Sequence, residues 1–396
     1  RVTGYALLLR APGAQEELDA EHAAARVIVD TFTAIGVQAI AGGRPAYVQT
    51  PRRFLLEGHA FALPPARVVL ELPDPDPADA ALRPVLERLV EQRYRLSLTC
   101  GPGTQVPYSL MPLVESVKLE LGGLSPAEIA ALAERFRAAT ATLIAAGVDS
   151  HALLQQCRAA GFDRFQGFFL CTPDVVAGQA PPTARISRLR SLAGLYAHAS
   201  FEELEETITR DVGLSFRLLT YLNSAYFNLP RRVSSVREAI MLLGTRAVQR
   251  WATLITLSGA EDTPHELTLT ALLRARLCEL VGQSLPVPAA DGDACFTVGL
   301  LSVIDALANA PLAQALKPLP LADEVRTALL EGRGPMGEAL AAVLAYERGE
   351  LDAAAQRAPD VALGDLYLSA LAWADDTSGL LRSTTRTMAA TTSGAN

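Results

Sequence analysis

The sequence predicts an α/β unit followed by an all-α unit: an N-terminal (β/α) TIM-like barrel and a C-terminal bundle of helices. Three observations support this. Over residues 1–175, short β-rich runs alternate with helical stretches rich in Ala, Leu and Glu. Residues 176–186 lack apolar periodicity and contain two adjacent prolines, as a linker would, and apolar spacing is helical over residues 187–374. The chain of 396 residues is long enough for several domains of about 150 residues.

Seven runs in the N-terminal region have the β-branched and aromatic content of strands. They are Gly4–Leu9, Ala46–Gln49, Arg67–Leu72, Arg95–Thr99, Ser116–Leu121, Thr142–Val148 and Phe165–Leu170. Strands that alternate with helices pair in parallel, and six or seven such units are enough to close a barrel. A capping box over Ser125–Glu128, with Pro126 at the first helical position, marks the start of one intervening helix.

Apolar residues recur at helical spacing in the C-terminal region. One amphipathic helix is predicted by Leu204 and Ile208, and a second by Leu214, Leu218, Leu219 and Leu222. Capping boxes at Ser200–Glu203 and Ser235–Glu238 predict two helix starts. Residues 375–396 are rich in Ser and Thr and have few large apolar side chains, so we expect a disordered tail.

Composition excludes several classes of protein. Hydrophobic residues make up 50% of the chain and charged residues 20%, which excludes a disordered protein. The net charge of −8 makes nucleic acid an unexpected partner, because phosphate binding calls for a basic face. The five cysteines are widely spaced and form no C-x-x-C pair, as expected of reduced thiols in the cytoplasm, most of them buried as small apolar side chains. Apolar runs fall short of the roughly 20 residues of a membrane span.

The C-terminal ends of the strands are where a (β/α) barrel builds its active site. In this chain those positions hold Gln49, Glu71, Thr99, Cys100, Lys118, Glu120, Asp149 and Gln166. Three are carboxylates on separate strands and Gln49 adds an amide oxygen, which is a small ligand set for a hard divalent cation. The alternative interpretation is that these residues form a polar rim without a catalytic role.

Five motifs in the N-terminal region occur in the order typical of one family. They are Gly4–Arg10, Val68–Leu72, Val117–Glu120, Ala146–Ser150 and Phe165–Phe169. In this order and spacing they resemble the EAL domains, barrel phosphodiesterases of bacterial cyclic di-GMP. The resemblance covers about residues 1–175 and implies the barrel fold.

The resemblance also implies that the metal site is degenerate. Family ligand positions fall at Ala6, Gln49, Thr99, Cys100, Ala146 and Asp149. By the same resemblance, the chain retains four family residues: Glu71 as a metal ligand, Lys118 near the attacking water, Gln166, and Arg10 at a phosphate-contacting position. We therefore expect no catalytic residue, no metal and no cofactor, and a relic pocket of Arg10, Glu71, Lys118, Glu120, Asp149 and Gln166 that could bind the nucleotide.

Six segments of the C-terminal region resemble a second family. The segments are Glu203–Ile208, Asp211–Ser215, Leu218–Ala225, Arg232–Ile240, Leu243–Gly244 and Trp251. They are similar to the HDOD domain, a helical relative of the metal-dependent HD phosphohydrolases, over about residues 186–260. Phe296–Ser302 and Ala345–Glu347 resemble the helical extension found where HDOD follows a degenerate EAL domain, which is a bacterial signalling arrangement.

HD phosphohydrolases bind metal through adjacent His and Asp residues, and none of the five histidines here is followed by Asp. We therefore expect a metal-free HDOD domain. Its motif residues Asn223, Ser224, Arg231, Arg232, Arg237 and Trp251 are candidates for an interaction surface. Alternatives stay open: Asn223 can cap a helix, the arginines, with Arg246 and Arg250, can form a solvated face, and Trp251 can pack in the core.

These observations predict a non-catalytic signal-transduction protein whose two domains act as protein-interaction modules. One alternative is a receptor that binds cyclic di-GMP through Arg10 and Gln166 without hydrolysing it. Another is a weak residual phosphodiesterase that uses Glu71, Glu120, Asp149 and Lys118. The expected partners are proteins of a bacterial signalling pathway, a second copy of the chain in a homodimer, or cyclic di-GMP, and not a membrane.

Overall fold

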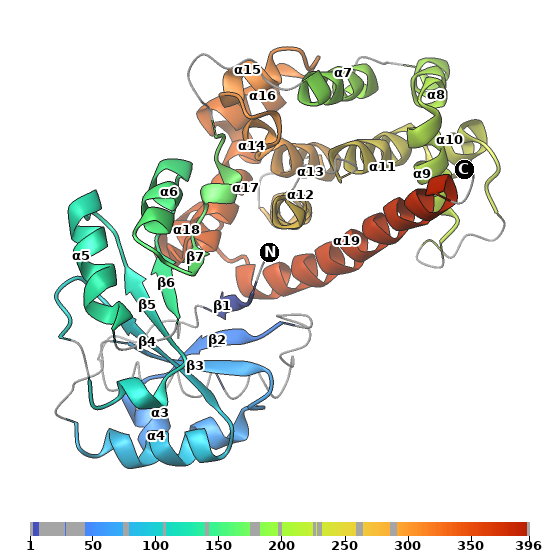
Figure 1. Ribbon diagram of the computed structural model, residues 1–396. Helices are drawn as coiled ribbons and strands as arrows, with labels where there is room; N and C mark the ends of the chain where they lie inside the picture. The colour runs from blue at the N-terminus through green and yellow to red at the C-terminus, as the bar shows by residue number, and fades with distance from the viewer. Residues whose placement is uncertain are drawn as a thin grey trace. The chain divides into compact units, whose positions relative to one another are not determined.

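The computed structural model describes residues 3–7, 28, 44–73, 79–105, 108–138, 142–174, 183–196, 200–224, 227, 232–258, 264–285 and 291–393. The chain divides into two compact units, Arg1–Leu170 and Cys171–Asn396 (Figure 1). The first unit ends five residues before the predicted boundary at 175. Residues 176–182 of the predicted linker lie outside the described ranges, and its last residues belong to helix α7 (Thr183–Tyr196). None of the described helices combines the length and apolar character that crossing a bilayer requires.

The N-terminal unit is built on one sheet of seven parallel strands, paired in chain order. The strands are β1 (Tyr5–Leu7), β2 (Ala46–Gln49), β3 (Val68–Pro73), β4 (Arg95–Cys100), β5 (Ser116–Glu120), β6 (Leu143–Ala146) and β7 (Arg164–Gln166). All seven predicted strands are present, although β6 and β7 end earlier than expected. Gly147 and Gly167 follow these two strands with positive φ, which interrupts the extended backbone.

The sheet is strongly curled. Arg164 Nη1 on β7 donates to Tyr47 Oη on β2 at 2.6 Å, although four strands separate the two in the pairing order. Such a contact requires the sheet to bend around a common interior, as in a barrel. Among the described strands, β1 pairs only with β2 and β7 only with β6, so the predicted barrel is found as a curled half-barrel.

Alternate residues of each strand face opposite sides of the sheet. The outer face carries apolar residues such as Leu70, Leu98 and Leu119, which form one core with the helices that follow the strands. Those helices are α3 (Arg52–Leu56), α4 (Leu82–Glu91), α5 (Pro126–Arg137) and α6 (His151–Ala159). The predicted capping box at Ser125 and Glu128 begins α5. The inner face holds a smaller apolar cluster of Tyr47, Val69 and Ile144.

The C-terminal unit is helical, as predicted. After α7 come α8 (Phe201–Arg210), α9 (Val212–Leu222), α10 (Val236–Leu243), α11 (Thr245–Ser258), α12 (His265–Ser284), α13 (Gly292–Leu301), α14 (Ile304–Ala308), α15 (Leu312–Leu316), α16 (Asp323–Glu331), α17 (Gly334–Glu347), α18 (Leu351–Arg357) and α19 (Leu363–Ser393). Helix α12 is central, because it packs against α13, α17 and α19. All five cysteines are free, and four of them are buried, as the sequence suggested.

The predicted disordered tail is wrong for residues 375–393, which continue helix α19 (Figure 1). Thr377 and Ser378 are almost fully buried, and Leu381 belongs to the helical core. Ser378 Oγ also lies 3.3 Å from His265 Nδ1 on α12. Small hydroxyl side chains let α19 approach α12 closely, so a low content of large apolar residues did not prevent packing here.

We expect Gly167→Ala to destabilise the N-terminal unit by about 3 kcal/mol, because the backbone has φ +154° and a Cβ would overlap the carbonyl group of Val148. Urea unfolding of the full chain measures the change. Gly122→Ala is the matched control, since no atom lies within 4 Å of its Cβ; it should change stability by less than about 0.5 kcal/mol. Equal effects of the two substitutions would contradict the strained turn.

Candidate functional site

The inner face of the sheet brings three polar side chains together near the strand ends. Glu71 lies beside Ser97 in the β3–β4 register, and Thr99 lies beside Lys118 in the β4–β5 register. The neighbours of Glu71 and Lys118 along each strand, such as Leu70 and Leu119, belong to the outer core. Alternation therefore turns Glu71, Thr99 and Lys118 inward, where 3%, 4% and 8% of their surface is exposed.

Glu71 and Lys118 form a buried ion pair across strand β4. Lys118 Nζ donates to Glu71 Oε2 at 2.6 Å, and the two side chains are 10% and 4% exposed. Such a short bond between charged groups is stronger than one between neutral groups. The ammonium of Lys118 thus neutralises Glu71, the carboxylate that the EAL resemblance implies as a metal ligand.

Two buried oxygens beside this pair have no hydrogen-bond partner among the described residues. They are Glu71 Oε1 and Thr99 Oγ1. A carboxylate has lone pairs for several donors, so the second oxygen of Glu71 can still accept from a water or a ligand. The site thus has one neutralised ion pair and spare hydrogen-bonding capacity.

The other predicted strand-end residues surround the pair without joining it. Gln49 and Glu120 are exposed at the ends of their strands, and Gln166 is half-buried. Asp149 is exposed, and its Oδ1 accepts the backbone N–H of Phe168 at 2.9 Å, which fixes the turn after β7. Cys100 is buried in the outer core and so faces away from the site. Arg10 lies outside the described residues.

These side chains do not fit a divalent metal. Within the described part of the chain, His, Cys, Asp and Glu side chains form no group of three that could hold an ion. A cation bound to Glu71 would also lie beside the Lys118 ammonium, which repels it. We therefore derive no chemical step through a metal at this site.

In the helical unit, Asn223 is the C-cap residue of α9, so the capping interpretation is confirmed. Its side-chain amide also forms three hydrogen bonds to backbone groups. Nδ2 donates to the carbonyl oxygens of Leu219 and Val233 at 2.8 Å, and Oδ1 accepts the N–H of Val233 at 2.7 Å. The side chain therefore joins the end of α9 to the segment before α10. Ser224, the next residue, has a buried Oγ with no partner among the described residues.

The remaining HDOD-motif residues differ in their exposure to solvent. Trp251 was a candidate surface residue, but it is only 8% exposed and stacks with Tyr221 and Trp373 at centroid distances of 4.5 and 6.2 Å. Its core interpretation is confirmed. Arg232 is exposed, and Arg237 pairs with Glu205 at 2.7 Å. Arg231 lies outside the described residues.

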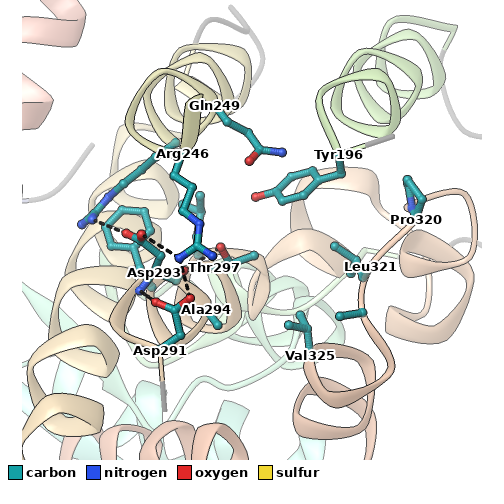
Figure 2. A pocket seen from close by; sticks show the side chains of 14 residues that line it. Tyr196, Arg246, Gln249, Asp291, Asp293, Ala294, Thr297, Pro320, Leu321 and Val325 are labelled. Atoms are coloured by element: carbon teal, nitrogen blue, oxygen red, sulfur yellow. Dashed lines mark hydrogen bonds and ion pairs between the residues drawn. The ribbon is translucent and has the colours of Figure 1, made fainter. Parts of the chain in front are cut away.

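Sequence reasoning missed a pocket in the helical unit, with a volume of about 220 Å³ (Figure 2). Its walls come from α7, α11, α13, α16 and the segment before α16. Arg246 and Arg250 were recognised in the sequence as basic residues, but the fold alone brings them together with Tyr196 and Asp293. No local signal could have shown this, because the four residues span about a hundred positions of the chain.

Comparison with known families agrees with the helical architecture. A family model for the HDOD domain matches residues 185–351, from α7 to the start of α18. The chain therefore contains an HDOD domain. The match does not include the N-terminal half-barrel, whose EAL resemblance stays a prediction.

Two relatives align over most of the chain. The uncharacterized protein YuxH of Bacillus subtilis (strain 168) is 25% identical over 390 residues, which cover 94% of each chain. Cyclic di-GMP phosphodiesterase CdgJ of Vibrio cholerae serotype O1 is 25% identical over 354 residues, 88% of this chain and 82% of that protein.

Among solved structures, a calcium and cyclic di-GMP complex of BlrP1 from Klebsiella pneumoniae is similar at 17% identity and a TM-score of 0.35. The alignment covers 43% of this chain and 51% of that one, so the chain spans about half of the solved protein. A TM-score of this size is too low to establish a shared fold.

We expect Lys118→Met to destabilise the N-terminal unit by about 3–5 kcal/mol, because it leaves the buried Glu71 carboxylate unpaired. Replacing both partners, as in Glu71→Leu with Lys118→Met, should recover most of that loss. Urea unfolding measures both. Exposed Lys317 provides the control, and Lys317→Met should have an effect below about 0.5 kcal/mol. A single Lys118→Met variant as stable as the parent would show that the pair is not formed.

Asn223→Ala should destabilise the helical unit by about 2–3 kcal/mol, since it removes three hydrogen bonds to backbone groups. Asn223→Asp keeps the acceptor for Val233 but places a carboxylate oxygen against the carbonyl oxygens of Leu219 and Val233, so we expect it to destabilise at least as much as Asn223→Ala. Thermal melting followed by circular dichroism ranks the three proteins. If Asn223→Asp and Asn223→Ala were both neutral, the amide would not hold the loop.

Proposed function

We propose that the chain is a non-catalytic bacterial signal-transduction protein in which the half-barrel and the HDOD domain act as protein-interaction modules. The proposal places it in cyclic di-GMP signalling, as the name of its Vibrio cholerae relative suggests. In this proposal the half-barrel is a degenerate EAL domain, and neither domain performs chemistry.

The single observation that supports the loss of catalysis is the content of strand β4, where the EAL resemblance expects paired Asp ligands but the chain has Thr99 and Cys100, and Cys100 faces the outer core. Metal-assisted hydrolysis requires carboxylates that hold the cation, which then lowers the pKa of bound water. Here the ammonium of Lys118 lies 2.6 Å from Glu71 and already balances its charge. Lys118 is correspondingly engaged as an ion-pair partner, so it is poorly placed to activate a water.

The HDOD domain supports the same proposal from the chemistry of its residues. The adjacent His and Asp of the HD phosphohydrolases are missing from the sequence. Its motif residue Asn223 is instead used to hold backbone groups in place. A domain whose motif residues stabilise its shape is suited to presenting a surface to a partner protein.

A second candidate is a receptor that binds cyclic di-GMP intact. The unpartnered oxygens of Glu71 and Thr99 favour it, because they leave hydrogen-bonding capacity for a ligand at the strand ends. Half-buried Gln166 lies at the end of β7, an edge strand of the described sheet. In this candidate, Arg10 contacts a phosphate of the nucleotide, as the EAL resemblance implies.

Titration calorimetry of the full chain with cyclic di-GMP, with and without Mg²⁺ or Mn²⁺, tests these functions. For the interaction protein we expect no saturable heat and, by chromatography of the same samples, no hydrolysis product. Metal-independent binding would replace that proposal with the receptor, provided that Arg10→Ala and Gln166→Ala each weaken binding at least about tenfold.

Metal-dependent turnover that Glu71→Ala abolishes would overturn both the interaction-protein and the receptor proposals, and would establish a residual phosphodiesterase. Gln92→Ala is the control for the Gln166 variant, since Gln92 is exposed at the C-terminal end of α4, outside the strand-end site. A loss of binding in Gln92→Ala equal to that in Gln166→Ala would place the nucleotide away from the strand ends.

A further inference from the structure

The pocket of the helical unit has two chemically different sides (Figure 2). Arg246, Asp291 and Asp293 gather on one side. Pro320, Leu321 and the neighbouring Val325 form the opposite side. A ligand that fills this space has to present charged or polar groups to one wall and an apolar group to the other.

The charged side is balanced but incompletely paired. Arg246 Nη1 bonds Asp291 Oδ2 at 2.7 Å, while Asp293 approaches Arg246 and Arg250 only to 3.8 and 3.5 Å. Normal charge-assisted hydrogen bonds are about 2.7–2.9 Å long. The Asp293 carboxylate is thus held in the field of two arginines without a close bond to either, and it can accept a hydrogen bond from a ligand.

The pair of Arg246 and Asp291 can open for a ligand. Their side chains are 72% and 50% exposed, and an ion pair so exposed contributes only about 0–1 kcal/mol. Arg250 cannot open as readily, because Glu279 binds it through both oxygens at 2.9 and 2.7 Å in a mostly buried setting. Arg246 is therefore the cation of the pocket that a ligand carboxylate can reach.

Tyr196 and Thr297 lie between the two sides. Burial raises the pKa of the Tyr196 phenol. The hydroxyl therefore stays protonated at neutral pH. The ring of Tyr196 lies next to the apolar wall in Figure 2.

We propose that this pocket binds a free α-amino acid with an apolar side chain. Its carboxylate pairs with Arg246, its ammonium lies between Asp291 and Asp293, and its side chain packs on Leu321 and Val325. Both carboxylates approach the same nitrogen of Arg246, at 2.7 and 3.8 Å, so one ammonium can serve both. A simple anion would displace Asp291 from Arg246 and leave that carboxylate unpaired, whereas the ammonium of a zwitterion gives Asp291 a new partner. A volume of about 220 Å³ suits a molecule of this size.

Titration of the full chain with L-leucine and L-phenylalanine, followed by NMR and calorimetry, tests this site. We expect saturable binding that Arg246→Gln and Asp293→Asn each weaken at least about tenfold. Both side chains are exposed, so both variants should melt at the temperature of the parent. Arg237→Gln removes a comparable exposed ion pair away from the pocket and should leave the affinity unchanged.

Matched ligands separate the two charges. Isocaproate lacks the ammonium of leucine and isopentylamine lacks its carboxylate, so each should bind at least about tenfold more weakly than leucine. L-serine tests the apolar wall and should also bind weakly. Equal binding of isocaproate and leucine would overturn the zwitterion site, and so would the absence of saturable binding or binding that survives both variants.

Discussion

Polar side chains inside the curled sheet must satisfy one another, and this constraint explains the centre of the N-terminal unit. The parallel strands turn every second residue toward the inner face, where Glu71, Thr99 and Lys118 are buried. Three cross-strand polar contacts follow: Arg164 with Tyr47, Ser116 with Ser97, and Lys118 with Glu71. A buried polar group without a partner costs about 1–3 kcal/mol, and a buried charge costs more. The curl of the sheet and these pairs therefore depend on each other.

The helical unit obeys the same constraint around α12. This helix is buried on nearly all sides, yet it carries Arg274 and Glu279 at 5% and 6% exposure. Arg274 pairs with Glu347 of α17 at 2.8 Å, and Glu279 pairs with Arg250 of α11. Burial opposes ionisation of Glu279, but the hydrogen bonds and charge of Arg250 and Arg276 outweigh it and lower the pKa of the carboxyl group. Each pair fixes where a neighbouring helix meets α12.

Local patterns in the sequence were enough to predict most elements of the fold. Strand content, the capping box at Ser125 and the helical spacing of Leu204 and Ile208 all act within a few residues, so one sequence reveals them. The extent of α19 was missed because burial of Thr377 and Ser378 depends on α12, about a hundred residues earlier. Likewise, the strand-end positions of Glu71 and Lys118 could be predicted, but their pairing could not, since it depends on how tightly the sheet curls.

The ion pair also explains how the N-terminal unit can bury the carboxylate of Glu71 without a bound cation to balance its charge. Glu71 is 3% exposed, and a carboxylate so deeply buried has to be neutralised by a positive charge or a proton. Lys118 supplies the positive charge from within the chain, at 2.6 Å. Folding of this unit therefore needs no bound ion to bury Glu71, and the neighbouring inward residue Thr99 adds no further negative charge. The remaining oxygen of Glu71 has no partner among the described residues, so beyond the ion pair this part of the inner face offers hydrogen-bonding capacity and no second charge.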